Sequence, residues 1–276
     1  MTGLDRILEN ALQEDIHTGD ITTLAVVPDP RPSRARLIAK EAMVLAGIDV
    51  AARVFHLLDS SVNYSPAFRD GDRLQPGDVL AEVDGDAAIL LQGERVALNL
   101  LQRMCGVATL TSRYVSAVEG TGARVVDTRK TTPGLRMLDK YAVRVGGGIN
   151  HRTGLYDGVL IKENHIAAAG GITEAIRRAR AYIPHTMKIE VETESLAQVV
   201  EALAASADII MLDNMDLNSM AEAVRLIDGR ALVEASGGVN LETIRAIAGT
   251  GVDIISIGAL THSARAMDIS MLLEGA

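Results

Sequence analysis

Six short apolar runs after Gly120 constrain the fold of the chain more than any other feature. Each run passes into charged, hydroxyl-bearing or glycine residues, and the runs are ARVVDTRK, GVLIKEN, MKIEVE, DIIMLDN, ALVEASGG and DIISIGA. Short, continuously apolar runs are typical of strands that are buried on both faces of a parallel sheet. Their separation, roughly 20–35 residues, is the length of a strand and its crossover helix. The pattern therefore predicts repeated βα units.

The number of runs limits which βα architecture is possible. Six strands are too few for a complete eight-stranded barrel. We therefore predict an α/β fold with an incomplete (β/α) barrel, and an open doubly wound sheet is the alternative. Two of the intervening helices are predicted to begin with capping boxes, Ser195 with Gln198 and Ser219 with Glu222.

The first part of the chain follows another pattern. Between residues 34 and 85, extended segments alternate with turn motifs such as Asp70-Gly71 and Pro76-Gly77, which predicts an α+β layer. Residues 90–119 form a long, mostly apolar helical pattern that is typical of a buried helix or a subunit interface, and Gly106 is expected to kink or end it. We predict an N-terminal α+β domain of residues 1–106, with which the tail 266–276 can pack, and a barrel domain of residues 107–265.

Composition excludes several classes of protein. The single cysteine, Cys105, rules out an internal disulfide and favours a reducing, cytoplasmic location. No apolar run reaches the roughly 18 residues of a membrane span, and the first residues lack a secretory pattern. The chain is acidic, has no Trp and only two Phe, so a nucleic-acid-binding surface is not expected.

One segment has the opposite charge to the rest of the chain. Residues 124–162 carry a net charge of +5, whereas the whole chain carries −9. A cleft lined by charge of one sign focuses the electric field, so the segment predicts a site for anions. The planar guanidinium of arginine suits carboxylates, and the ammonium of lysine suits phosphate. The cations at strand ends or in loops, which we expect to contact the ligand, are Arg129, Lys130, His151, Arg152 and Lys162.

A helix is predicted inside the same segment. Thr132-Pro133 are expected to open it, because proline is favoured in the first helical turn. Arg136, Lys140 and Arg144 recur every four residues, and we assign them to a solvated face of this helix rather than to the ligand site.

The ends of the six runs are expected to meet at one edge. In a barrel the carboxyl ends of the strands form one rim, where catalytic residues lie. The polar residues that end the runs are Asp127, Lys162, Glu192, Asp213, Ser236 and Gly258. The last two runs lead through Ser236-Gly237-Gly238 and Gly258-Ala259 into helices, and such turns present free N–H groups to a phosphate.

The ordered motifs of the chain resemble the quinolinate phosphoribosyltransferase family. The resemblance spans nearly the whole chain, and the motifs that carry it are EDIHTGDITT, LQGERVALNLLQRMCG, DTRKTTPGLR, KYAV, GGGINHR, LIKENH, LDN, EASGG and SIGALTH. It implies a step of NAD biosynthesis in which quinolinate and 5-phosphoribosyl-1-pyrophosphate give nicotinate mononucleotide, pyrophosphate and CO2, with Mg²⁺ as cofactor. Once the ring nitrogen carries the ribose, the positive ring itself stabilises the carbanion left by CO2.

The resemblance also implies an assembly and a set of site residues. It implies a homodimer in which Arg95 reaches the partner's site. Lys130, Lys162, Glu192 and Asp213 are the implied catalytic residues, and the last two can stabilise the sugar cation, hold the ribose hydroxyls or support Mg²⁺. The implied substrate contacts are Arg95, Thr128, Arg129, Lys130, His151, Arg152, Lys162, Glu192, Asp213, Ser236, Gly237, Gly238, Ile257, Gly258 and Ala259.

Three other functions are compatible with parts of the pattern. A related phosphoribosyltransferase would use nicotinate or another planar acid, but the cluster of arginines and histidine suits two carboxylates better. A barrel lyase or aldolase would form a Schiff base on Lys162. A non-catalytic protein would bind phosphoribosyl pyrophosphate without turnover.

Overall fold

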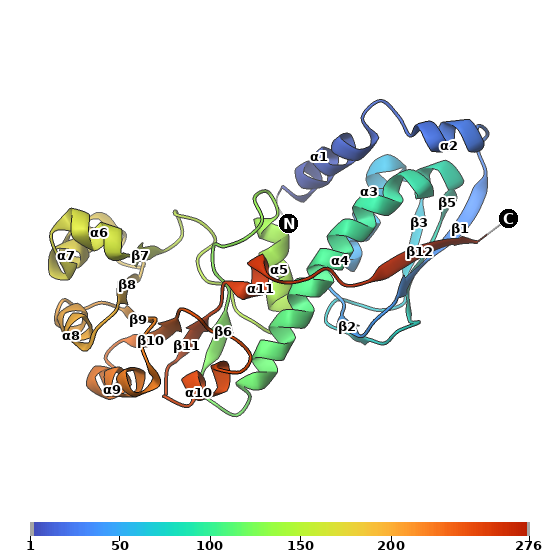
Figure 1. Cartoon of the computed structure of the whole chain (residues 1–276). Coiled ribbons are helices and arrows are strands. Elements are labelled where there is room, and N and C mark those ends of the chain that lie inside the picture. The colour runs from blue at the N-terminus through green and yellow to red at the C-terminus, as the bar shows by residue number, and fades with distance from the viewer. Residues whose placement is uncertain (1–2, 275–276) are drawn as a thin grey trace. The chain divides into compact units, whose positions relative to one another are not determined.

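The computed structural model describes residues 3–274 of the chain (Figure 1). It divides into two compact units, Met1–Ser112 with Thr132–Gly147 and Ser263–Ala276, and Arg113–Thr131 with Gly148–His262. Residues 1–2 and 275–276, which belong to the predicted N-terminal domain and tail, lie outside the described residues. No helix within residues 3–274 is both long and apolar enough to cross a bilayer.

The first unit is built on a four-stranded antiparallel sheet with the order β12-β1-β5-β3. Alternate residues of β1, among them Ala35, Leu37 and Ala39, are buried, as expected for a strand with one face toward the core. Strands β2 and β4 pair with each other and form a separate two-stranded sheet. The strands are β1 (Pro32–Ala39), β2 (Met43–Val44), β3 (Asn63–Pro66), β4 (Arg73–Leu74), β5 (Val79–Asp86) and β12 (Ile269–Glu274).

The longest helix of this part does not break at Gly106. The helices are α1 (Leu4–Ile16), α2 (Ile21–Val26), α3 (Ile48–Leu58), α4 (Ala87–Ala117) and α5 (Arg136–Val145). A Cβ atom at Gly106 would lie 1.9 Å from the backbone oxygen of Arg265. The glycine therefore permits a close backbone approach, and the predicted kink or end at this position was wrong. Cys105 is fully buried in the same helix.

Helix α5 differs from its prediction in two ways. It begins at Arg136, because residues 132–135 form a turn in which the Leu135 N–H donates to Thr132 O at 3.0 Å. Lys140 is buried, so the predicted solvated face was wrong for this residue. The neighbouring Asp139 is buried too, and it accepts two hydrogen bonds from Arg103. A four-residue periodicity of charge cannot distinguish solvated charges from charges that find partners elsewhere in the chain.

The second unit contains a six-stranded parallel sheet with the order β6-β11-β10-β9-β8-β7. Five successive strands lie in sequence order without the reversal that defines a doubly wound sheet. Strands β6 and β7 lie at the two ends of the order, so the predicted incomplete barrel is confirmed. The six apolar runs are its six strands, β6 (Arg124–Val126), β7 (Val159–Ile161), β8 (Ile189–Thr193), β9 (Ile209–Asp213), β10 (Leu232–Ser236) and β11 (Ile254–Ser256).

Helices cover one side of this sheet (Figure 1). They are α6 (Glu163–Ala169), α7 (Ile172–Tyr182), α8 (Leu196–Ala204), α9 (Leu217–Ile227), α10 (Ile244–Ala248) and α11 (Ala259–His262). Ser195 caps α8 and accepts from the Gln198 N–H, as predicted. The predicted cap of α9 was wrong, because Asp216 caps that helix and accepts from the Ser219 N–H at 3.1 Å. A carboxylate one turn earlier competes successfully for the same free N–H groups.

The parallel sheet brings the carboxyl ends of its strands to one edge. A single parallel bridge between Val126 and Ile149 adds the start of the 149–158 loop beside β6. This bridge places Asn150, His151 and Arg152 next to the residues that follow β6. The loop therefore fills the side of the sheet at which β6 has no neighbouring strand among the named ones.

Candidate active site

A cavity of about 320 Å³ lies at the carboxyl ends of the barrel strands. Seven residues predicted for the site line it together, and four further residues complete its wall. The predicted residues are Thr128, Arg129, Lys130, His151, Arg152, Lys162 and Ser236; the others are Leu160, Met211, Glu234 and Ser256. The structure thus brings the cations of three separate segments into one cavity, as the sequence predicted.

The cations of this cavity repel one another. Burial, followed by the positive charge of Arg129, lowers the pKa of Arg152. Arg152 is held in place by a hydrogen bond of 3.0 Å from its Nη1 to Gly158 O. Lys162 Nζ forms an ion pair with Glu192. Like charges held this close together favour a ligand that carries at least two negative charges.

A buried carboxylate positions the loop that carries two of these residues. Asp127 is fully buried at the end of β6. Its oxygens accept from the His151 backbone N–H at 2.8 Å and from Asn150 Nδ2 at 2.7 Å. Charge-assisted hydrogen bonds are short and directional. Asp127 therefore fixes the backbone of residues 150–152 against the sheet.

Two glycine turns lie beside the cavity. Gly237 has φ +92°, and a Cβ atom there would lie 2.1 Å from Asn214 Oδ1, so only glycine fits. At Gly258 a Cβ atom would lie 3.0 Å from Lys130 Cδ. The hydroxyl of Thr261, one turn after Gly258, donates to Lys130 O at 2.9 Å. The contacts with Lys130 keep the turn after β11 close to this lysine, and Gly237 directly follows Ser236.

Sequence reasoning missed two buried acids beneath the rim. Glu190 in β8 and Glu234 in β10 each lie two residues before a predicted site residue, Glu192 and Ser236, and so face the same side of their strands. Both are almost completely buried. Each interrupts an otherwise apolar run, and that interruption could have revealed them.

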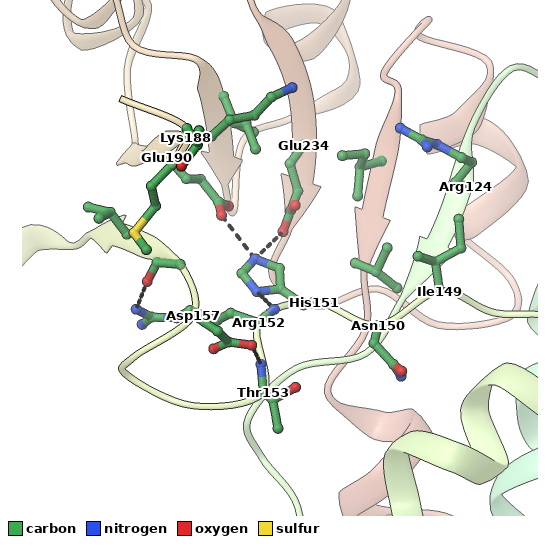
Figure 2. Close-up of a pocket in the computed structure, with 17 residues that line it drawn as sticks. Arg124, Ile149, Asn150, His151, Arg152, Thr153, Asp157, Lys188, Glu190 and Glu234 are labelled. Carbon is green, nitrogen blue, oxygen red and sulfur yellow. Dashed lines mark hydrogen bonds and ion pairs between the residues drawn. The ribbon is translucent and has the colours of Figure 1, made fainter. Parts of the chain in front are cut away.

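The two acids face His151 (Figure 2). His151 Nε2 lies 2.9 Å from Glu190 Oε2 and 3.8 Å from Glu234 Oε1. The Arg152 backbone N–H donates to His151 Nδ1 at 2.8 Å. Both ring nitrogens therefore face groups of the protein, which supports a positioning role. A direct contact of this ring with a substrate carboxylate stays a prediction.

Sequence models of one family match nearly the entire chain. The N-terminal domain of quinolinate phosphoribosyl transferase matches residues 20–105, and the C-terminal domain of the same enzyme family matches residues 107–272. The chain belongs to the quinolinate phosphoribosyltransferase family.

Individual members of this family are similar over the full length. The probable nicotinate-nucleotide pyrophosphorylase [carboxylating] of Bacillus subtilis (strain 168) is 48% identical, and the match covers 97% of this chain and 92% of that protein. The nicotinate-nucleotide pyrophosphorylase [carboxylating] of Mycobacterium leprae (strain TN) is 47% identical, over 96% and 95%. The crystal structure of NadC from Streptococcus pyogenes has a TM-score of 0.95 with 48% identity, covering 99% of this chain and 98% of that one.

Several residues predicted from the family resemblance lie outside the cavity lining. Glu192 and Asp213 lie at the carboxyl ends of neighbouring strands, β8 and β9. Gly237, Gly238 and Gly258 belong to the turns after β10 and β11, Ala259 begins α11, and Ile257 is buried. Arg95 lies in α4 in the other compact unit, where it is exposed and 3.7 Å from Glu94.

The oxygen ligands at the rim suit a magnesium ion. Mg²⁺ prefers carboxylate, phosphate and water oxygens and is commonly held by one or two carboxylates together with substrate phosphates. Glu192 and Asp213 supply two carboxylates on adjacent strands, and each already accepts a hydrogen bond, from Lys162 and from Asn214 Nδ2. These two carboxylates are therefore the residues of the rim that could hold Mg²⁺.

Proposed function

We propose that this protein converts quinolinate and 5-phosphoribosyl-1-pyrophosphate to nicotinate mononucleotide, pyrophosphate and CO2, a step of NAD biosynthesis. The observation that carries the proposal is the cavity itself, in which four cations meet beside two glycine turns. These cations are Arg129, Lys130, Arg152 and Lys162. The chemistry of a dicarboxylate and a phosphorylated sugar matches this arrangement, and family membership supports it.

The two carboxylates of quinolinate account for the paired arginines. Arg129 and Arg152 present planar guanidinium groups that bind carboxylates through two parallel hydrogen bonds. A dianion relieves the repulsion that lowers the pKa of Arg152. Lys162 adds a third positive charge, and the hydrogen bonds of Asp127 to residues 150 and 151 hold the loop in position. The protein thereby orients the pyridine nitrogen.

In this proposal the phosphorylated sugar binds beside the glycine turns, away from the two arginines. Ser236 and the turns at Gly237 and Gly258 offer hydroxyl and backbone N–H groups to the 5-phosphate. Lys130, which contacts Gly258, is placed to offset the charge of the departing pyrophosphate. Glu192 and Asp213 hold the ribose hydroxyls and would hold Mg²⁺. When bound, Mg²⁺ supplies charge neutralisation to the pyrophosphate.

Bond formation then depends mainly on position and electrostatics. The ring nitrogen attacks C1 of the ribose as the bond to pyrophosphate breaks, so positive charge develops on the sugar. Holding the two reacting atoms in line supplies the proximity contribution. The carboxylates of Glu192 and Asp213 stabilise the developing sugar cation. The quinolinate ring then carries a positive nitrogen beside the carboxylate that leaves as CO2.

One assay tests the reaction and the substrate together. Purified protein, Mg²⁺, phosphoribosyl pyrophosphate and carboxyl-labelled quinolinate should release labelled CO2 only when all components are present. Nucleotide formation from nicotinate without CO2 release from quinolinate would instead establish the related non-decarboxylating enzyme. A substrate adduct trapped on Lys162 by borohydride would establish the lyase. Binding of phosphoribosyl pyrophosphate without any turnover would contradict an enzymatic role.

A matched pair of lysine variants tests the location of the site. Lys162 lines the cavity at the carboxyl ends of the strands, whereas Lys188 lines a separate cavity of about 630 Å³. We expect Lys162→Met to lower kcat/KM by about 1,000-fold, because it removes a charge that contacts the reacting molecules. Lys188→Met should stay within about threefold of the unchanged protein. Equal losses in the two variants would contradict the assignment.

We further propose a cytoplasmic homodimer in which Arg95 completes the partner's site. Its exposed position on a mostly buried helix supports this role. Arg95→Ala and Arg152→Ala should each be inactive alone. Hybrid dimers formed by mixing the two variants should recover up to about a quarter of the activity, because statistical pairing leaves one intact site in half of the dimers. Dimeric mixtures that stay inactive would refute the shared site.

A further inference from the structure

The decarboxylation half of the proposed reaction requires a proton. The inference about the source of this proton rests on the proposed function. When the bond from the ring to CO2 breaks, its electron pair stays on the ring carbon beside the nitrogen. Nicotinate mononucleotide carries hydrogen at this carbon. A proton must therefore reach the carbon in a cavity whose other charged groups serve to bind anions. Glu234 lies where such a proton donor is needed.

Glu234 lies between two cavities. It lines the cavity that contains Arg129, Arg152 and Lys162, and it also lines the cavity of about 630 Å³. The larger cavity is lined by residues at the amino ends of the strands, such as Arg124, Lys188, Ile209 and Ile254, and by the 149–158 loop. Glu234 thus lines the substrate cavity and also a second, adjoining cavity.

The protein does not use the full hydrogen-bonding capacity of this carboxyl group. Glu234 is only 1% exposed. Its Oε1 has no hydrogen-bond partner among residues 3–274, since the 3.8 Å to His151 Nε2 is too long. Burying a carboxylate in this state costs far more free energy than burying the neutral, protonated carboxyl group. The environment therefore favours the form that can donate a proton.

The contacts of His151, drawn as dashed lines in Figure 2, indicate which of its neighbours holds a proton. His151 Nδ1 accepts from the Arg152 N–H, so in the neutral ring Nε2 carries the hydrogen and donates it to Glu190 at 2.9 Å. A nitrogen that carries hydrogen cannot ligate a metal, although His151, Glu190 and Glu234 are close enough to enclose one. The arrangement leaves Glu190 as the acceptor and Glu234 as the protonated acid.

The net effect of the groups around Glu234 also favours its protonated form. Burial, and then the negative charge of Glu190, raise the pKa of Glu234 to about 7. His151, the hydroxyl of Ser256 and Lys162 oppose this change only in part. Arg152 lines the same cavity. At neutral pH a substantial fraction of Glu234 is therefore protonated, as a general acid should be.

We propose that Glu234 is the general acid that protonates the pyridine carbon from which CO2 departs. The carbon–carbon bond to the carboxylate breaks, CO2 leaves, and the electron pair remains on the ring carbon. That pair takes the proton from the Glu234 carboxyl oxygen and forms the new carbon–hydrogen bond. Glu234 becomes a carboxylate and regains a proton from water that enters through the second cavity, so no oxidant or further reactant is required.

Glu234→Gln tests this role with little change of shape. The test is a single turnover with carboxyl-labelled quinolinate and phosphoribosyl pyrophosphate, in which pyrophosphate, CO2 and nicotinate mononucleotide are each measured from pH 5.5 to 9. In the unchanged protein, formation of nicotinate mononucleotide should slow above pH 7. In the variant it should be about 100-fold slower at pH 7 and lose this alkaline limb, while the Kd of quinolinate stays within about threefold.

The outcomes separate the inference from the proposed function. If the unchanged protein releases neither pyrophosphate nor CO2, the proposed function fails. If it is active and the variant stays within threefold at pH 7, Glu234 is not the acid. A slower variant that keeps the same alkaline limb would show a structural role and would also overturn the inference.

Glu190→Gln provides an independent second variant. It keeps an acceptor for His151 but removes the negative charge that holds the proton on Glu234. The alkaline limb should therefore move to lower pH by more than about half a unit, with the rate at pH 5.5 within about threefold. An unmoved limb would overturn the inference even if Glu234→Gln did not fold.

Discussion

Two regions of the molecule bury carboxylates in opposite ways. In the N-terminal unit, Asp139 of α5 is fully buried, and its two oxygens accept from Arg103 at 2.9 and 2.8 Å. In the barrel, Glu234 is buried to nearly the same degree, but its Oε1 has no hydrogen-bond partner within residues 3–274. Both oxygens of Asp139 are hydrogen-bonded, whereas one oxygen of Glu234 is not.

This difference separates a structural charge from a functional one. A buried carboxylate with a bidentate arginine is satisfied, so removing its charge takes a charged partner away from the guanidinium. A buried carboxyl group without such a partner is unfavourable when ionised, and groups of this kind concentrate at sites that move protons. The comparison teaches that burial alone does not assign a role to an acid; the partner does.

The largest expected effect comes from breaking the paired acid. Asp139→Asn should destabilise the N-terminal unit by about 3–5 kcal/mol, because Arg103 would lose its charged partner. The Tm measured by calorimetry should fall by roughly 10 °C. Glu174→Gln is the control, since Glu174 pairs with Arg177 and Arg178 at the surface, and its Tm should change by about 1 °C or less. A similar Tm for both variants would remove the distinction between buried and exposed pairs.

Removing the charge of Glu234 should change the stability of the protein in the opposite direction. The pKa of Glu234 is raised from 4.5 to about 7, so between these values the folded protein binds more protons than the unfolded chain and loses stability as the pH rises. Glu234→Gln removes this loss and should stabilise the protein by about 3 kcal/mol at pH 8, but not below pH 4.5. Thermal unfolding at pH 4 and pH 8 measures the difference. A Tm that falls at pH 8 would contradict the assignment of Glu234 as an unsatisfied acid.

The smallest effect is expected for the acid that has one partner. Glu190 accepts from His151, and its charge is one cause of the raised pKa of Glu234. Glu190→Gln should therefore raise the Tm at pH 8 by only about 1–3 °C. The same thermal scans measure Glu234→Gln. A larger gain in Tm at pH 8 for Glu190→Gln than for Glu234→Gln would contradict this prediction.

The sequence by itself determined the layout of the barrel and most of its rim. Continuous apolar runs can be buried only as strands covered on both faces, so their number and spacing predict six parallel strands. Polar residues at the ends of these runs then identify the edge on which the site lies. The positively charged segment predicted Arg129, Lys130, His151, Arg152 and Lys162 as ligand contacts, and all five line one cavity. Motif resemblance supplied the family and the reaction that these residues serve.

Only the tertiary structure decided the environment of the charges. The periodicity of α5 placed Lys140 in solvent, but the structure buries it, and Asp139 is satisfied by Arg103, 36 residues earlier. Glu190 reaches its histidine across 39 residues. A local pattern records which residues are charged, whereas the cost of burying a charge depends on which group the fold brings against it. The roles of the buried acids therefore became visible only when the strands, helices and loops were packed together.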